Sequence, residues 1–450
     1  MGLALMRCRR PLTLLQPLLL CWLLTTAALP ALAARRHAKA AVHESSSVDL
    51  PIVVDAIEIA GLTRTHPDVV FRELPFNAGE RVIQETWDFA LTRLWNLDIF
   101  SHVSGDIIRR DGKVIAIFTL EERWTLNPLF AFGAGSGVAW VRGGATDTNL
   151  AGRFLEYGAQ YQRFTHFNGF QAWFRDPRFL GKHIDWLVLA DQLVRPRGDF
   201  ADRRLRFATD LSWLGWNDAF RIGGRVDVMR TTFIPPDGSD PGPDAPQAWA
   251  ASYSLASMIG RVDTEGIRQE GISLEIRASL VTTAPPSLAF ANDFGRVWVE
   301  SVGFLTVGER WNFAGRVQAG AQGDAPRQLR FYIGGLDEVR GYTDNFASTS
   351  RYAIANLETR FIALESTWIA LQPAVFVDGG IAATETRTVR PMLSAGTGVR
   401  ILFPWMVDSG LRVDVAVPMA NGCTGGRSFC PDVSIGVYQY FDGKWQPASR

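Results

Sequence analysis

The sequence has few cysteines and histidines, and it has no excess of charge of either sign. It contains four cysteines, six histidines and no formal net charge in 450 residues. A chain without excess positive charge has no electrostatic support for binding nucleic acid. No nucleotide-binding motif occurs, and neither a cofactor nor a metal site is expected. A secreted soluble enzyme can have the same composition as a membrane protein. The order of the residues must therefore distinguish these two classes of protein.

Long apolar runs are also scarce, because only residues 12–29 approach the roughly 20 apolar residues that a spanning helix needs. A basic segment precedes this run, and Ala31-Leu32-Ala33 follows it as a small-residue cleavage site. We therefore assign residues 1–34 to a signal peptide and residues 35–49 to a polar linker. An uncleaved membrane anchor is the alternative. An exported chain does not act in the cytoplasm.

Two of the four cysteines lie in the predicted signal peptide. The other two, Cys423 and Cys430, lie close together in a glycine-rich segment. An even pair in an oxidising compartment predicts a local disulfide. A metal site is the alternative, but no histidine and no third cysteine lies nearby in the sequence.

Residues 50–123 predict a small α+β domain. Thr65 is expected to cap the first helix, with Asp68 three residues later. The second helix has one apolar face, formed by Ile83, Trp87, Ala90, Leu91 and Leu94. The predicted order is a strand at 52–59, a helix at 65–74, a helix from 83 to 94, and strands at 103–109 and 114–122.

From about Trp124 onward the pattern changes to period two, with apolar residues alternating with polar ones. Segments of about ten residues repeat over more than 300 residues, whereas strands of a soluble β-sandwich, the alternative, average five or six. Long and short connections also alternate. We therefore predict a mainly β fold, in which residues 124–450 form a sixteen-stranded antiparallel transmembrane β-barrel. The strands are expected at 126–134, 137–148, 153–164, 167–175, 183–194, 203–213, 219–231, 249–261, 270–282, 296–306, 310–320, 350–363, 368–378, 391–403, 408–417 and 432–441.

The longest connection, residues 321–349, carries the sequence Val339-Arg340-Gly341-Tyr342. Alternation places Phe376 and Asp378 on the inner face of the strand that follows, and Glu358 on the inner face of the strand before it. If the loop folds inward, Arg340 meets these carboxylates. Ordinary charge pairing in a wet lumen is the alternative interpretation.

Within this loop, Gly341 is expected to permit a tight tip, and Tyr342 is expected to pack on Phe376. These motifs resemble those of the outer-membrane protein assembly and two-partner-secretion transporter superfamily, also called the bacterial surface antigen family. The resemblance implies a V-R-G-[FY] loop tip held against an F-x-D-x-G motif, here Phe376, Asp378 and Gly380. It also implies that the domain at residues 50–123 is a polypeptide-transport-associated (POTRA) domain, and the alternative is any small α+β domain. This chain has a single such domain, and Asp442 to Arg450 trails the last predicted strand.

The resemblance implies a protein of the bacterial outer membrane that inserts or translocates polypeptides. Its POTRA domain would receive unfolded or extended clients in the periplasm, and the seam between the first and last strands would be the weak closure. A passive pore or a structural barrel of the same fold is the alternative. Catalysis is not expected, because the only histidines of the barrel, His166 and His183, fall at opposite ends of it.

Overall fold

A computed structural model describes residues 50–437 of the chain, without 198, 216–218, 238, 240–246, 266, 285–292, 384–388, 404–409 and 424–429. The predicted signal peptide, the linker and the segment after residue 437 lie outside the described residues. Among the described residues, no helix combines the length and the apolar character needed to cross a membrane.

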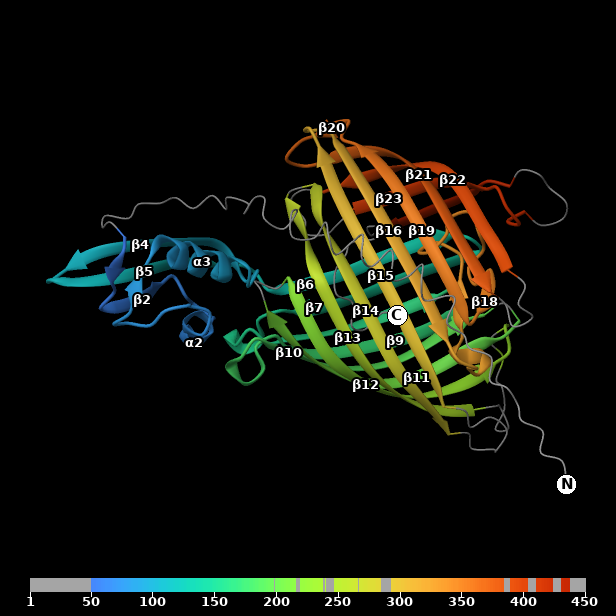
Figure 1. Ribbon diagram of the computed structural model, residues 1–450, viewed down its shortest axis with the longest axis horizontal. Coiled ribbons are helices and arrows are strands. Elements are labelled where there is room, and N and C mark those ends of the chain that lie inside the picture. Colours follow the sequence, from blue (N-terminus) through green and yellow to red (C-terminus); the bar gives the residue numbers. More distant parts are fainter. Residues whose placement is uncertain are drawn as a thin grey trace, which may run out of the picture. The chain divides into compact units, whose positions relative to one another are not determined.

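The N-terminal domain contains a three-stranded sheet in the order β2-β5-β4, in which β2 runs parallel to β5 and β4 antiparallel to it (Figure 1). A separate two-stranded pairing joins β1 to β3. The bounds are β1 (Ile52–Val53), β2 (Ala56–Ala60), α2 (Pro67–Phe71), β3 (Arg81–Val82), α3 (Gln84–Trp95), β4 (Phe100–Arg110) and β5 (Lys113–Glu122).

Helix α3 packs its apolar face against the sheet. The indole of Trp87 stacks on Phe118 with ring centroids 5.0 Å apart, and Leu91 and Leu94 are buried beside it. Ile83 does not belong to this face, because it lies at the N-cap position and its residue is 46% exposed. The buried face therefore begins one turn later than its sequence period predicts.

The predicted cap of the first helix was wrong. His66, not Thr65, is the N-cap of α2, and Pro67 occupies the first helical turn. Proline suits that position because its missing N–H would be unpaired there in any case. The Thr65 N–H instead donates to the carboxylate of Glu122, at 2.6 Å.

Residues 126–437 form the predicted closed barrel of sixteen antiparallel strands, which is confirmed (Figure 1). A further two-residue strand, β20 (Leu364–Glu365), pairs with the start of β21. The wall strands are β6 (Leu126–Gly135), β7 (Val138–Asp147), β8 (Glu156–Phe164), β9 (Phe167–Asp176), β10 (Ile184–Pro196), β11 (Ala201–Gly215), β12 (Phe220–Ile234), β13 (Gln247–Glu265), β14 (Arg268–Ala284), β15 (Phe294–Val307), β16 (Trp311–Gln322), β19 (Arg351–Phe361), β21 (Ala370–Ala383), β22 (Val389–Leu402), β23 (Gly410–Pro418) and β24 (Asp432–Val437).

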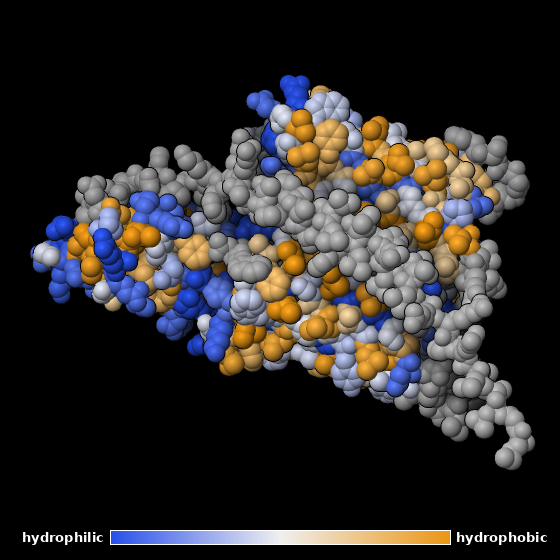
Figure 2. Space-filling model, viewed as in Figure 1, coloured by the Kyte–Doolittle hydropathy of each residue, from blue (hydrophilic) through white to orange (hydrophobic). Residues whose placement is uncertain are grey.

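Side chains along the wall alternate between an apolar outer face and a polar lumen. On β19, Leu357 is 67% exposed on the outside, whereas its neighbours Asn356 and Glu358 are at most 2% exposed. Apolar side chains cover much of the barrel face seen in Figure 2. A soluble β-sandwich buries its apolar face between two sheets, so the sandwich alternative was wrong.

The ring closes where β24 meets β6, and the pairing is described as far as Gly436. The strands pair at Ile435 with Ala134 and at Gly436 with Gly133, whereas β6 pairs with β7 along its whole length. The carboxylate of Asp432 adds a polar clasp by accepting hydrogen bonds from the backbone N–H and the hydroxyl of Ser136. Among the described residues, β6–β24 is the shortest junction between wall strands of the barrel.

We predict that Glu122→Gln destabilises the N-terminal domain at pH 7 by about 1–2 kcal/mol. Burial raises the pKa of Glu122, but hydrogen bonds from Thr63, Thr65 and the Arg64 N–H lower it to about 2. Because the folded-state pKa is depressed from 4.5, the stabilisation is present at neutral pH and fades as pH falls from about 4.5 toward 2. Pulse proteolysis in urea, scored by cleavage within residues 50–122, measures it. Equal urea midpoints for the two proteins at pH 7 would contradict the prediction, as would a difference that does not shrink at pH 3.

Candidate functional site

The connection between β16 and β19 lies in the lumen. It contains the short antiparallel pair β17 (Phe331–Ile333) and β18 (Ala347–Thr349), with the tip residues between them. Val339 and Tyr342 are fully buried, and Arg340 is 1% exposed. A loop tip with so little solvent contact is part of the folded interior of the barrel.

Arg340 meets both carboxylates that alternation places on the inner face. Its Nε and Nη2 donate to Asp378 at 2.7 and 2.9 Å, a bidentate pair, and its backbone N–H donates to the same carboxylate at 3.1 Å. Its Nη1 donates to Glu358 at 2.7 Å. The guanidinium also lies over the ring of Phe376, 3.4 Å from the centroid. Planar, multiply donated contacts of this kind require arginine and would not be reproduced by lysine.

Arg340 belongs to a larger buried charge network. Arg360 and Arg400 each donate to Glu358 at 2.8 Å, so three guanidiniums share that carboxylate. Arg400 also donates to Asp414 at 2.6 Å, and Arg412 lies 3.5 Å from Asp414. The members are Arg340, Arg360, Arg400, Arg412, Glu358, Asp378 and Asp414.

The sequence prediction missed Arg400, Arg412 and Asp414. Arg412 and Asp414 fall on the polar face of their strand by alternation, which was the available signal. What alternation does not reveal is the register in which neighbouring strands such as β21, β22 and β23 pair. Their proximity to Arg340 depends on the packing of the loop against β22 and β23.

Two inward side chains hold the loop backbone just before the tip. Arg316 donates from Nη2 to the carbonyl oxygen of Asp337 at 2.7 Å, and from Nε to Asn356 at 2.9 Å. Asn356 in turn donates to the carbonyl oxygen of Glu338 at 2.8 Å. These contacts satisfy carbonyl groups that would otherwise be buried without partners.

Space for the tip comes from glycines in the loop and the wall. Gly341 has φ +88°, a conformation that glycine adopts without strain. A Cβ at Gly396 on β22 would lie 2.3 Å from the ring of Phe376. A Cβ at Gly380 would lie 3.4 Å from Val339, so this glycine permits close packing of loop on wall.

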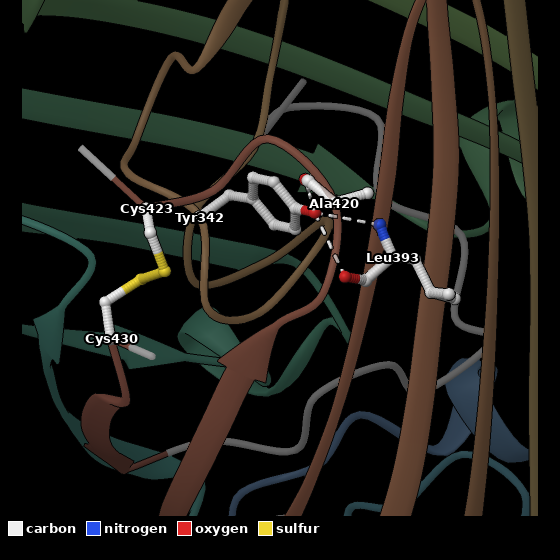
Figure 3. The surroundings of a disulfide bond; sticks show 5 residues. All are labelled: Tyr342, Leu393, Ala420, Cys423 and Cys430. Carbon is white, nitrogen blue, oxygen red and sulfur yellow. Dashed lines mark hydrogen bonds between the residues drawn. A yellow bond between two sulfur atoms is a disulfide. The ribbon is translucent and has the colours of Figure 1, made fainter. Parts of the chain in front are cut away.

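Tyr342 does not have the expected ring partner. Its ring meets Phe346 in an edge-on arrangement with centroids 4.9 Å apart, while Phe376 faces Arg340. The Tyr342 hydroxyl bonds to the backbone of Leu393 and Ala420 (Figure 3). Tyr342 thus ties the tip to β22 and to the segment after β23.

The segment after β23 carries the bonded pair of Cys423 and Cys430, whose Cα atoms lie 5.7 Å apart. Figure 3 shows this disulfide in the surroundings of Tyr342. Among the described residues, no group of three or more metal-ligating side chains is placed to hold an ion.

The far side of the loop contacts the opposite wall. Asn345 accepts a hydrogen bond from Arg197 at 2.9 Å and donates to the carbonyl oxygen of Pro196 at 3.0 Å. The Asp344 N–H donates to the carbonyl oxygen of Ser136 at 2.9 Å. Pro196 ends β10, which lies eight positions from β21 in the ring of sixteen. The loop is therefore fixed to opposite sides of the barrel and crosses its interior.

Residues 253–427 match the family described as the Omp85 superfamily domain. This range includes the loop tip and the wall motif of Phe376, Asp378 and Gly380. Solved structures of similar fold include the following three. BamA from Haemophilus ducreyi lacking POTRA domains 1–3 has a TM-score of 0.62 and 16% identity, over 86% of this chain and 84% of that chain.

CdiB from Acinetobacter baumannii has a TM-score of 0.58 and 12% identity, over 86% of this chain and 74% of that chain. CdiB from Escherichia coli has a TM-score of 0.55 and 12% identity, over 94% and 97%. At such identities the structures show a shared fold, and the family assignment comes from the match over residues 253–427. Residues 253–427 of this outer-membrane β-barrel protein are thus similar to the Omp85 superfamily domain.

Proposed function

We propose that this protein inserts polypeptides into the outer membrane or translocates them across it. The observation that carries the proposal is the loop, held to opposite sides of the lumen by Arg340 and by Asn345. A barrel whose interior is crossed by a buried, charge-paired segment is poorly suited to free diffusion. Passage of a client requires either movement of the loop or opening of the wall.

The N-terminal domain is proposed to be a POTRA domain that lies in the periplasm and receives the client. Strand β2 is an outer strand of its sheet, and among the described residues its second edge pairs with no other strand. An extended segment can add to such an edge through backbone hydrogen bonds, which depend little on side chains. This mode of binding suits clients of varied sequence.

The β6–β24 junction is the proposed site at which the wall opens. It is the closure at which the last described wall strand meets the first, and in the described residues it pairs at Ile435 and Gly436. Gly436 contributes no side chain to cross-strand packing there. If β6 and β24 separate, each strand has an unpaired edge. A client strand could then form the backbone hydrogen bonds that close the barrel at this junction.

Arg340→Ala is predicted to impair protein insertion or export while leaving a barrel that still shifts in gel mobility on heating. Removing one partner from a buried charge network costs about 3–5 kcal/mol. This cost lowers the equilibrium constant for docking of the loop about a hundredfold or more. The readout is the abundance of outer-membrane and secreted proteins by quantitative mass spectrometry. Proteins whose abundance falls when this protein is deleted should also fall several-fold in abundance in Arg340→Ala cells.

The matched control is Arg327→Ala. Arg327 lies in the same loop, but its side chain is half exposed and pairs with Asp199 outside the buried network. This variant should behave as wild type. Normal abundance of all affected proteins in Arg340→Ala cells would contradict a role for the docked loop in transport.

A second prediction separates insertion from translocation. A disulfide between cysteines at Ala134 and Ile435 should lock the β6–β24 junction, because these residues pair in register. If clients insert through the wall, the locked protein loses activity until a reductant is added. A matched lock at Val399 and Val413, which joins β22 to β23, should leave activity unchanged.

Loss of activity with both locks would count against the junction as the specific gate. Full activity with the β6–β24 lock would instead assign transport to the lumen. The alternative function, a passive pore, has its own signature. It predicts a steady ionic conductance in planar bilayers that does not depend on any polypeptide and is present before the loop is released.

A further inference from the structure

The outer face of the barrel carries an apolar groove that spans β7 to β11. Its volume is about 430 Å³, within the roughly 300–1,000 Å³ of sites for small molecules. The large side chains that line it, Tyr161, Phe170 and Leu205, are exposed. They occupy the outward positions of their strands, so the groove opens toward the membrane rather than toward the lumen.

Alanines form the floor of this groove. Ala159 pairs with Ala172, and Ala172 pairs with Ala190, so three methyl side chains stand in one row across neighbouring strands. The next outward row holds the rings of Tyr161 and Phe170, whose centroids are 5.3 Å apart. A recess of short side chains beside large rings offers an acyl chain dispersion contacts from below and from one side.

Polar side chains follow one edge of the groove, on a face of the wall that is largely apolar. Arg163 on β8 pairs with Asn168 on β9. Arg203 on β11 pairs with Val194 on β10. The register between β9 and β10 brings these two pairs into the same row. The row lies one outward position beyond the rings, so both arginines border the groove.

Neither arginine has an anionic partner among the described residues. The Arg163 Nε donates only to the carbonyl oxygen of Thr165, at 3.4 Å, and the exposed side chain of Arg203 forms no bond within the described chain. An outward arginine is costly at the middle of a bilayer and costs little among the headgroups. The hydroxyl of Tyr161 points to the same edge and donates to Asn168 at 2.7 Å. This edge therefore lies at the level of the headgroups.

The two arginines are spaced to act on one headgroup. Neighbouring strands lie roughly 4.8 Å apart, so three strand steps separate the backbones of Arg163 and Arg203 by about 14 Å. Two long, exposed side chains can close that gap from either side. Guanidinium forks match the paired oxygens of phosphate, and such charge-assisted bonds are stronger than neutral ones. The edge and the groove thus complement two parts of one molecule, a phosphate and an acyl chain.

We propose that this groove binds a phosphate-bearing lipid of the surrounding membrane. The acyl chain lies on the alanine floor, and Arg163 and Arg203 hold the phosphate. Both arginines lie at the end of the barrel opposite to the start of β6, which follows the N-terminal domain. With that domain in the periplasm, as proposed above, the lipid belongs to the outer leaflet. The binding itself depends neither on that placement nor on transport of polypeptides.

The test is native mass spectrometry of the purified full-length protein in neutral detergent, titrated with bisphosphorylated lipid A. Wild type is expected to retain one lipid molecule with saturable affinity. Combined Arg163→Gln and Arg203→Gln changes are expected to weaken the affinity about tenfold or more, because the phosphate loses both cations. Both side chains are exposed, so the double variant should keep the heat-modifiable mobility of the folded barrel.

A second variant, Ala172→Trp, tests the groove without changing charge. Ala172 faces outward and is exposed, so an indole there fills the recess while meeting only lipid or detergent. Lipid A should bind several-fold more weakly to this protein as well. Unchanged binding would overturn the proposal, because the acyl chain would then lie elsewhere.

The matched charge control combines Arg351→Gln with Arg390→Gln. These arginines are exposed at the starts of β19 and β22, at the same end of the barrel but away from the groove. Their removal changes the net charge equally and should leave lipid binding unchanged. Equal weakening by the two double variants would contradict the proposed site, since it indicates a general attraction between charges. Absence of saturable binding to wild type would overturn the proposal outright.

Discussion

The interior of this barrel is organised by the need to pair buried guanidinium groups with carboxylates. A charged group taken out of water is expensive unless partners surround it. The side chain of Arg340 reaches Asp378, Glu358 and the face of Phe376 only if the loop tip lies against the wall. The same pairing requires Arg400 to stand between Glu358 and Asp414. The position of the loop is thus a consequence of charge satisfaction across several strands.

That constraint links the fold to its proposed activity. One loop contacts opposite sides of the barrel. Displacing it would therefore break contacts across the lumen as well as the contacts of its tip. The described wall is held by antiparallel ladders, and the described part of the β6–β24 junction pairs at Ile435 and Gly436. In the proposed function, a bridged interior favours opening of the wall at the β6–β24 junction over passage through the lumen. A client strand that replaces lost backbone hydrogen bonds can offset the cost of opening without a nucleotide.

Much of the architecture follows from the sequence because alternation has a fixed period of two. Once a strand is recognised, each residue on it is assigned to the lumen or to the outer face, as for Asp378 and Val377. Alternation carries no information about the register between neighbouring strands or about where the loop packs, which explains why Arg400, Arg412 and Asp414 were missed. Alternation also does not reveal side-chain rotamers. Tyr342 was therefore predicted to pack on Phe376, although the ring of Phe376 faces Arg340.

The N-terminal domain illustrates a different limit. Its two helices and three-stranded sheet were predictable in order, but the predicted strand at 52–59 is divided into β1 and β2, and β3 was missed. The Thr65 cap failed because Glu122, 57 residues away, bonds to the side chain of Thr65 as well as to its N–H. Long-range partners of this kind override local capping preferences.

The central claim is that the loop tip lies in the lumen against β21, and a cysteine pair at Val339 and Gly380 tests it most directly in native membranes. Rapid disulfide formation that leaves gel mobility and membrane insertion intact is the predicted result, and absence of the bond under oxidising conditions would contradict it.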